Sequence, residues 1–135
     1  LLKPYIEIQF LTGDKSGYNI SKKRVVDDMK FPLEIVSTVK RTEWISEHYD
    51  LDEVIYMGDG IFDHYVFQKI GYAIAPANAD IVAKKHANYV TTNSGGNRAV
   101  AEACLHILEK FFEAYNPDEL PESGNKMSGE WKVWL

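Results

Sequence analysis

The chain has 135 residues, of which 45% are hydrophobic and 26% charged, and its formal net charge is −5 at pH 7. This length suits one domain with a sizeable core and excludes two ordinary domains. The negative charge argues against a nucleic-acid partner. No apolar run approaches the roughly 20 residues of a membrane span, and no secretory signal is visible, so we expect a cytoplasmic protein. A single cysteine, Cys104, excludes an internal disulfide and a cysteine-based metal cluster.

Strand and helix patterns alternate from the start of the chain. Residues 5–11 and 33–36 predict strands. Residues 22–30 predict a helix capped by Ser21, with Val25, Val26 and Met29 on one face. Residues 39–49 predict a second helix, with Trp44, Ile45 and His48 facing inward.

The same alternation continues to residue 115. Residues 54–57, 72–75 and 88–92 predict strands, and the first of these reads as buried on both faces. Helices are expected from Asp63 to residue 69, after a cap at Asn78, and over residues 98–115. In the last helix we expect one apolar stripe at positions 101, 104, 105, 108, 111, 112 and 115. The pattern as a whole predicts an α/β fold with a mostly parallel sheet.

The two ends of the chain differ in character from this core. Leu-Leu-Lys-Pro at the start resembles the last turn of a helix, so we expect the sequence to begin within a domain. Residues 116–135 are polar and end in an aromatic patch. We expect this tail to be either disordered or docked on a neighbouring subunit.

Two aspartates, Asp59 and Asp63, flank a glycine-rich turn that follows the predicted strand 54–57. Ligands bind at the carboxyl ends of the strands in open α/β sheets. Two hard oxygen ligands at this spacing suit Mg²⁺. The alternative is that Asp59 is a turn residue and Asp63 only a helix cap.

Other polar residues are expected at the same edge. Thr12 and Gly13 end the first predicted strand and offer a hydroxyl and backbone N–H groups to an anion. Lys40 opens a helix, where its charge is unfavourable for the helix dipole unless an anionic ligand is present. Residues 95–98, Gly-Gly-Asn-Arg, open the last helix and can form an anion nest. Each of these is also plausible as an ordinary turn, loop or solvated side chain.

The succession of hydroxyl, lysine and paired aspartates resembles the haloacid dehalogenase (HAD) superfamily of phosphohydrolases. Thr12 matches its second motif, Lys40 its third, and GDGIFD, residues 58–63, its fourth. Residues 71–109, with "APA", "YVT" and a GG-x-x-AV-x-E helix start, are similar to the capless branch. That branch contains the 3-deoxy-manno-octulosonate 8-phosphate phosphatases, and a related domain follows some acylneuraminate cytidylyltransferases.

The resemblance implies a Rossmann-like three-layer sandwich and hydrolysis of a small phosphate monoester, an acidic sugar phosphate, through an aspartyl-phosphate. Mg²⁺ would be held by Asp59 and Asp63, and the phosphate by Thr12, Gly13 and Lys40. Arg98 would reach the substrate carboxylate, and the protein would form a homo-oligomer such as a tetramer.

For one motif of the family, we expect the chain to have no matching sequence. The first motif, Asp-x-Asp-x-(Thr/Val), carries the nucleophile and ends a strand that precedes the Thr12 motif. The stretch "LTGDKSG" has one Asp and coincides with the second motif. We therefore expect residues 1–115 to be a core that lacks its first strand, and this fragment to be inactive by itself. Where the branch commonly has a second Asp after Asp59, this chain has Gly60.

Two other interpretations remain open from the sequence. The chain can be a non-catalytic module of the same fold that mediates oligomerisation, which its long apolar last helix and aromatic tail would support. A flavodoxin-like or receiver-like domain explains the alternation of elements, but it explains Lys40 together with the paired aspartates less well.

Overall fold

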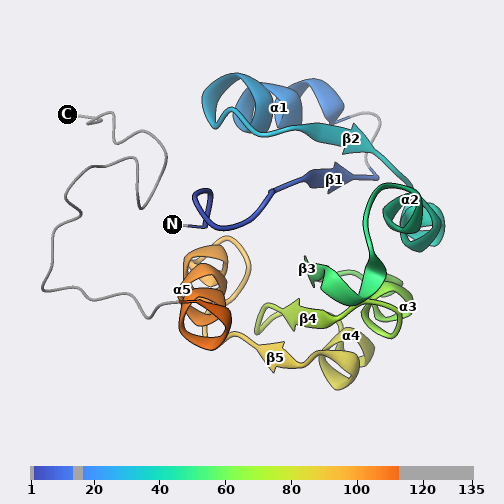
Figure 1. Ribbon diagram of the computed structural model, residues 1–135, viewed down its shortest axis with the longest axis vertical. Coiled ribbons are helices and arrows are strands. Elements are labelled where there is room, and N and C mark those ends of the chain that lie inside the picture. The colour runs from blue at the N-terminus through green and yellow to red at the C-terminus, as the bar shows by residue number, and fades with distance from the viewer. Residues whose placement is uncertain (1, 14–16, 113–135) are drawn as a thin grey trace, which may run out of the picture.

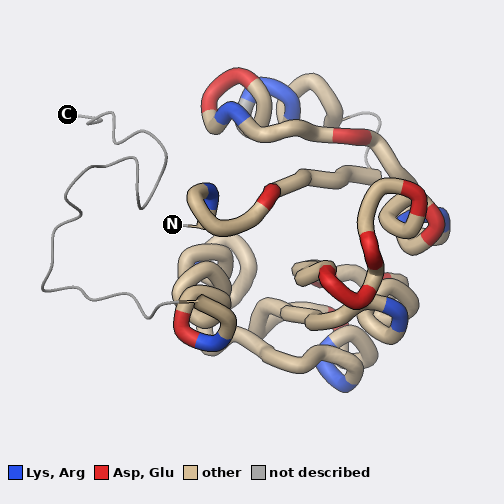
Figure 2. The backbone as a smooth tube through the Cα atoms, viewed as in Figure 1, with Lys and Arg blue, Asp and Glu red and all other residues tan. Residues whose placement is uncertain are grey.

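The computed structural model describes residues 2–13 and 17–112. The predicted tail, residues 116–135, and position 115 of the predicted stripe lie outside these residues. None of the helices in the described ranges is long and apolar enough to cross a membrane. Lys and Arg positions are spread along the described backbone over several helical segments (Figure 2).

The described strands confirm an α/β fold with parallel pairing. They are β1 (Phe10–Thr12), β2 (Leu33–Ile35), β3 (Ile55–Met57), β4 (Tyr72–Ala75) and β5 (Tyr89–Val90). Every pairing between them is parallel. They form two sheets, β1-β2 and β3-β4-β5, where the sequence predicted one. In Figure 1, β1 lies on the side of its sheet that faces β3, but no ladder joins these two strands within the described residues.

Helical segments connect the strands. They are α1 (Tyr18–Lys22), the π-helical η1 (Lys23–Asp28), the 3₁₀ segments η2 (Thr38–Lys40) and η3 (Leu51–Glu53), α2 (Arg41–His48), α3 (Asp63–Phe67), α4 (Ile81–His86) and α5 (Ala99–Phe111). The predictions that a helix opens at Asp63 and that a strand covers residues 72–75 are confirmed.

The β3-β4-β5 sheet is covered by helices on both faces, which gives three layers. In β4, Ile74 packs in one buried cluster with Ala103 and Leu108 of α5. Its neighbours Ala73 and Ala75 belong to a second cluster on the opposite face, formed with Phe67 of α3 and Ala83 of α4. Successive residues of a strand point to opposite faces, so β4 contributes to both clusters. β3 does the same, with Ile55 and Met57 against the first cluster and Tyr56 against the second.

The buried face of α5 differs from the predicted stripe. The buried residues are Ala99, Ala103, Ile107 and Leu108. Of the predicted positions, Leu108 is buried and Cys104 is half-buried against the same cluster, whereas Phe111 is 44% exposed. The prediction was wrong because it followed the bulky side chains. Alanines four residues apart allow the helix to lie close to the sheet, and this close packing decides the face.

The first strand begins later than predicted, and the first helix begins earlier. Residues before β1 leave the strand because the N–H groups of Tyr5 and Ile6 both donate to the carbonyl of Leu2. Ser21, predicted as a cap, lies inside α1, since its N–H donates to the Gly17 carbonyl at 3.0 Å. Met29 is 45% exposed and does not share the buried position of Val25.

Three further predictions about side chains were wrong. His48 does not face inward but is exposed and stacks on Trp44, with ring centroids 4.0 Å apart. Asp80, not Asn78, caps α4, because its carboxylate accepts the N–H of Val82 at 2.9 Å. β3 is half-buried throughout, where burial on both faces was expected.

Glu102 of α5 fastens the loop after β5. Its Oε2 accepts the N–H of Thr92 and the hydroxyl of Tyr89, both at 2.7 Å. Its Oε1 accepts the N–H of Asn93 at 2.9 Å and the Asn93 side-chain amide at 2.8 Å. Burial acts to raise the pKa of this carboxyl, but the four hydrogen bonds outweigh it and lower the pKa from 4.5 to about 2.

This lowered pKa predicts a pH dependence of stability. The contribution of Glu102 is fully present above its unfolded value of about 4.5 and is lost as the pH falls towards 2. Glu102→Gln should lower the free energy of unfolding at pH 7 by about 1 kcal/mol, because an amide accepts more weakly. Urea unfolding across pH 2–7 should show a shallower acid slope in this variant. Glu109→Gln, an exposed change on the same helix, should keep the wild-type slope. Equal slopes in the two variants would contradict the assignment.

Candidate active site

The predicted site residues lie at or just beyond the ends of the strands. Thr12 is the last residue of β1 and Gly13 follows it, while Asp59 lies just beyond β3. The carbonyl of Thr12 accepts the N–H of Val36, which follows β2, at 2.8 Å. The loops after β1, β2 and β3 therefore form one edge, as expected for parallel strands.

Asp63 is the buried centre of this edge. The residue is 4% exposed, yet its carboxylate is fully engaged. Oδ1 accepts the hydroxyl of Tyr56 at 2.8 Å, and Oδ2 accepts the N–H of Gly60 at 2.7 Å. Arg41 supplies the positive charge, with Nη1 3.6 Å from Oδ1. A buried carboxylate needs such partners, since isolated it would be very costly.

Arg41 links the loops of both sheets. Its Nε and Nη2 donate to the carbonyl of Val36 at 3.3 and 3.0 Å, and its Nη1 donates to the hydroxyl of Tyr56 at 2.8 Å. Nη2 also lies 3.4 Å from the point where a Cβ on Gly13 would stand. One guanidinium thus contacts or approaches the loops after β1 and β2, a side chain of β3 and the start of α3.

The hydroxyl of Tyr56 bridges Arg41 and Asp63. Its hydroxyl receives a hydrogen bond from Arg41 and donates one to Asp63. Burial, and next the negative charge of Asp63, raise the pKa of Tyr56 above its ordinary value of 10, although Arg41 opposes the change. The phenol therefore stays a neutral donor across the physiological pH range.

Gly58 makes room for the buried carboxylate. A Cβ at this position would lie 2.5 Å from Cγ and from Oδ2 of Asp63. No side chain fits there without moving the aspartate. The glycine at the end of the strand therefore allows Asp63 to fold back against the backbone.

The two predicted metal ligands differ in their availability. Asp59 is exposed, and only its backbone carbonyl is engaged, by the N–H of Asp80 at 3.0 Å. Asp63 is buried, and both of its oxygens already have partners in Tyr56, Gly60 and Arg41. No three His, Cys, Asp or Glu side chains of the described residues come together as a metal cluster. Asp59 fits a divalent cation, whereas Asp63 does not fit as a direct ligand in this arrangement.

The other predicted residues surround the edge at different depths. Thr12 is half-buried, and Lys40 is exposed at the position before α2, beside the inward-facing Arg41. Arg98 is exposed at the start of α5 in a left-handed conformation, φ 66°, and Gly96 before it has φ 79°. No described contact joins Arg98 or Lys40 to Asp63.

The expectation that the chain has no sequence matching the nucleophile motif was wrong by letters. Residues 50–54 read Asp-Leu-Asp-Glu-Val, which fits Asp-x-Asp-x-(Thr/Val) by letters. They form η3 and its flanks, ahead of β3, so they lie at the amino end of that strand. Asp50 there caps the segment by accepting the N–H of Asp52 at 3.1 Å. Position and hydrogen bonding exclude this stretch as the catalytic motif.

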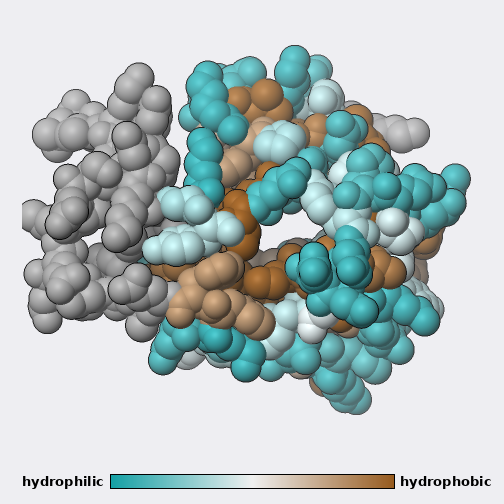
Figure 3. Space-filling view, viewed as in Figure 1, coloured by the Kyte–Doolittle hydropathy of each residue, from teal (hydrophilic) through white to brown (hydrophobic). Residues whose placement is uncertain are grey.

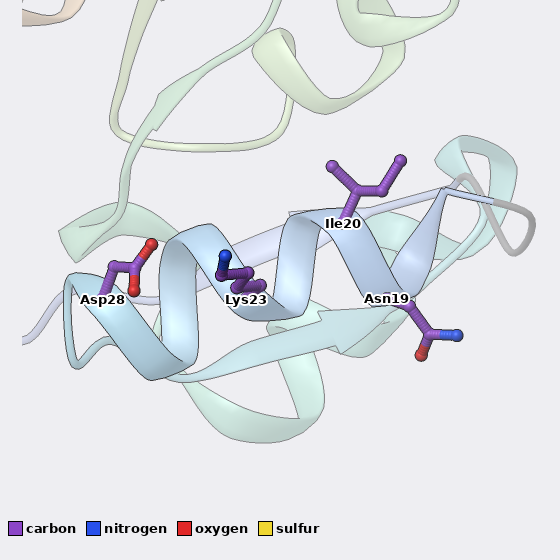
Figure 4. Close-up of a pocket in the computed structure, with 4 residues that line it drawn as sticks. All are labelled: Asn19, Ile20, Lys23 and Asp28. Atoms are coloured by element: carbon purple, nitrogen blue, oxygen red, sulfur yellow. The ribbon is translucent and has the colours of Figure 1, made fainter.

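Two hollows are visible on the molecule. The space-filling view shows an opening between the half that carries β1 and β2 and the half that carries β3–β5, with apolar side chains along its border (Figure 3). A separate pocket is lined by Asn19, Ile20, Lys23 and Asp28, all from α1 and η1 (Figure 4). The second hollow contains none of the strand-end residues and does not belong to the site.

Sequence reasoning missed Arg41 and Tyr56. Arg41 follows directly on Lys40, and consecutive residues of a helix point about 100° apart, so only one of the two bases can face the edge. The signal was available: a helix that begins with two bases beside an expected anion site offers two candidates. Tyr56 stands in an apolar strand, and its hydroxyl gave no sequence signal of its own.

Comparison with known proteins gives a consistent result. The sequence profile of the haloacid dehalogenase-like hydrolases matches residues 36–103. The 3-deoxy-D-manno-octulosonate 8-phosphate phosphatase KdsC of Salmonella typhimurium is 40% identical over 112 residues, which are 76% of this chain and 56% of the relative. Its counterpart in Escherichia coli K12 is 40% identical over 57 residues, 42% of this chain and 30% of the relative. The chain thus spans about half or less of these relatives.

Solved structures share the fold. The cobalt-bound deoxy-D-mannose-octulosonate 8-phosphate phosphatase of Haemophilus influenzae has a TM-score of 0.68 at 25% identity, covering 81% of this chain and 65% of that one. The Yersinia pestis phosphatase has a TM-score of 0.63 at 26% identity, covering 81% and 60%. The Moraxella catarrhalis phosphatase, solved with magnesium, phosphate and KDO, has a TM-score of 0.62 at 22% identity, covering 79% and 63%.

The close approach at Gly58 generates a stability prediction. Gly58→Ala should lower the free energy of unfolding by about 1–3 kcal/mol, because the new methyl group overlaps the Asp63 carboxylate. Gly60→Ala is the matched control: its Cβ would lie 3.3 Å from Oδ2, so a small shift suffices. Urea unfolding of the two variants measures the difference. Equal stabilities would mean that Asp63 does not lie against Gly58.

Proposed function

Because the chain belongs to the haloacid dehalogenase-like hydrolases, we propose that it is the core of a Mg²⁺-dependent phosphatase acting on a small phosphate monoester. The observation that carries this proposal is the single polar edge on which Gly13, Arg41 and Asp63 meet, beside the exposed Asp59. Its resemblance to the capless branch that contains the 3-deoxy-manno-octulosonate 8-phosphate phosphatases favours an acidic sugar phosphate as substrate.

The phosphate would lie over the end of β1. The Thr12 hydroxyl and the backbone of Gly13 offer hydrogen-bond donors there, and Lys40 adds a positive charge from the start of the next helix. Phosphoryl transfer depends mainly on positioning and charge neutralisation, so these groups act without bonding covalently to the substrate. Supporting this assignment, Gly13 is exposed and lies next to the Arg41 guanidinium.

A divalent cation would be held first by Asp59, with Asp63 as the second carboxylate behind it. Mg²⁺ supplies neutralisation of the phosphate charge when bound. Asp59 is suited to this role by its exposed carboxylate directly after β3. The Moraxella catarrhalis phosphatase was solved with both magnesium and phosphate, and we take the same kind of cation for this chain.

The nucleophile of the proposed reaction lies outside this chain. We assign it to an additional strand that would pair between β1 and β3 and complete one continuous sheet. The split of the sheet at this point and the apolar border of the opening support this placement (Figure 3). The strand would bring its aspartate to the same edge and form the aspartyl-phosphate. The 135-residue chain without that strand should hydrolyse no phosphate monoester.

Lys40 provides the first test of this function. Lys40→Ala in the full-length protein should lower kcat/KM for phosphate monoesters more than about hundredfold, since one positioned positive charge is lost. The thermal midpoint should stay unchanged, because Lys40 is exposed. Steady-state assays with 3-deoxy-manno-octulosonate 8-phosphate and neutral sugar phosphates would measure both the effect and the preference. Lys85→Ala on α4 is the control, and wild-type turnover in a folded Lys40→Ala protein would refute the role.

Arg98 is proposed to recognise the substrate carboxylate, from its own subunit or a neighbouring one in a homo-oligomer such as a tetramer. Arg98→Asn should raise KM for an acidic sugar phosphate about tenfold and leave kcat nearly unchanged. Asn is chosen because it tolerates the left-handed backbone at this position. KM for a neutral sugar phosphate should not change. An unaltered KM for the acidic substrate would remove this assignment.

A second candidate function is a non-catalytic oligomerisation module of the same fold. It is favoured by the exposed apolar side chains of α5, among them Val100 at 62% and Phe111 at 44%. The assays above discriminate between the two: a full-length protein that assembles but hydrolyses none of these esters would support the module. For either function, we propose a cytoplasmic protein.

A further inference from the structure

The carboxylate of Asp63 already lies beside a positively charged side chain, that of Arg41. Its two oxygens accept hydrogen bonds from Tyr56 and Gly60, and Arg41 stands 3.6 Å from Oδ1. The side chains of Arg41 and Asp63 are 11% and 5% exposed, so water screens this pair little. The site therefore differs from a metal site in which two carboxylates are exposed and have no other partner.

The guanidinium of Arg41 is held in place by more than its charge. Two of its nitrogens donate to the Val36 carbonyl, and a third donates to Tyr56. The Val36 carbonyl makes no contact with Asp63, so this part of the anchoring does not involve the carboxylate. Arg41 is consequently positioned by β2 and β3, and it presents a fixed positive charge to the carboxylate.

A divalent cation at Asp63 would meet this charge at close range. Two like charges at this distance repel each other, and the repulsion is large where water screens them little. One carboxylate oxygen cannot bind the divalent cation and the guanidinium of Arg41 at the same time. Either the cation binds at Asp59 alone, or the guanidinium moves away.

We propose that Arg41 is the built-in counter-ion of Asp63, and that a divalent cation gains Asp63 as a ligand only by displacing the Arg41 guanidinium. Arg41 then determines how tightly the site holds its cation. The inference rests on the proposed function only in taking a divalent cation as the ligand. It assigns to Arg41 a positioning role, and it predicts weak cation binding by the intact pair.

The test measures cation binding directly, without a substrate. Mn²⁺ alone is titrated into the 135-residue chain, and the free ion is counted by electron paramagnetic resonance. Arg41→Gln should bind Mn²⁺ at least about tenfold more tightly than the wild type, because the repulsion is removed. Lys69→Gln, which removes the same charge at an exposed position after α3, should bind as the wild type does. Adding Asp63→Asn to Arg41→Gln should abolish the gain.

A second variant keeps the inference testable if Arg41→Gln does not fold. Tyr56→Phe preserves the ring but removes the hydroxyl that joins Arg41 to Asp63. It should also tighten Mn²⁺ binding, by a smaller factor. The inference is overturned if neither variant tightens binding, or if Asp63→Asn in the wild-type background weakens binding as strongly as Asp59→Asn.

These results are independent of the hydrolase assays. Tight Mn²⁺ binding through Asp63 in the wild type would overturn the inference and leave the phosphatase proposal standing. A gain in Arg41→Gln combined with a full-length protein that hydrolyses no phosphate ester would support the counter-ion role and refute the phosphatase. The two failures are therefore distinguishable.

Discussion

The ion pair between Asp63 and Arg41 is the interaction on which the polar edge depends. A buried carboxylate without a partner costs several kcal/mol, and removal of one member of such a pair leaves the other charge unpaired. Here the pair also extends through Tyr56 and the Val36 carbonyl, so it joins β2, β3 and the start of α3. Gly58 permits this because a side chain there would overlap the carboxylate.

The pair also explains how two adjacent bases acquire different roles. Lys40 and Arg41 both stand at the beginning of α2, but the helix turns only one of them towards the strand ends. Arg41, with a planar fork of donors, can serve a carbonyl, a phenol and a carboxylate together. Lys40 remains exposed to solvent, where its flexible ammonium is suited to an incoming anionic ligand.

Part of this organisation could be predicted from the sequence. The alternation of apolar runs and turn residues identified the α/β class and the bounds of β4, and the turn before Asp63 identified the start of α3. The membership of the haloacid dehalogenase-like hydrolases agrees with the resemblance drawn from Thr12, Lys40 and residues 58–63. These features depend on local chemistry, which a short window of sequence contains.

What could not be predicted depends on contacts between distant residues. The two-sheet arrangement follows from the absence of a ladder between β1 and β3 in the part of the chain that the structure describes, and no local sequence pattern indicates an unpaired strand edge. The buried face of α5 is decided by small residues such as Ala103, because a small side chain lets the helix pack close to the sheet. The engagement of Asp63 required Arg41, which is 22 residues away in the chain, to face inward.

The division of the sheet has a further consequence for hydrogen exchange. The two buried clusters are centred on the β3-β4-β5 sheet, although one of them extends to Leu2 and its neighbours. Amides of β4 should therefore exchange only through global unfolding, whereas those of β1 and β2 can exchange through smaller openings. The carbonyl partner of Arg41 belongs to the part of the chain around β1 and β2, and its carboxylate partner belongs to the part around the β3-β4-β5 sheet. The edge thus straddles two cooperative units, and its geometry can be lost and regained while most of the protein remains folded.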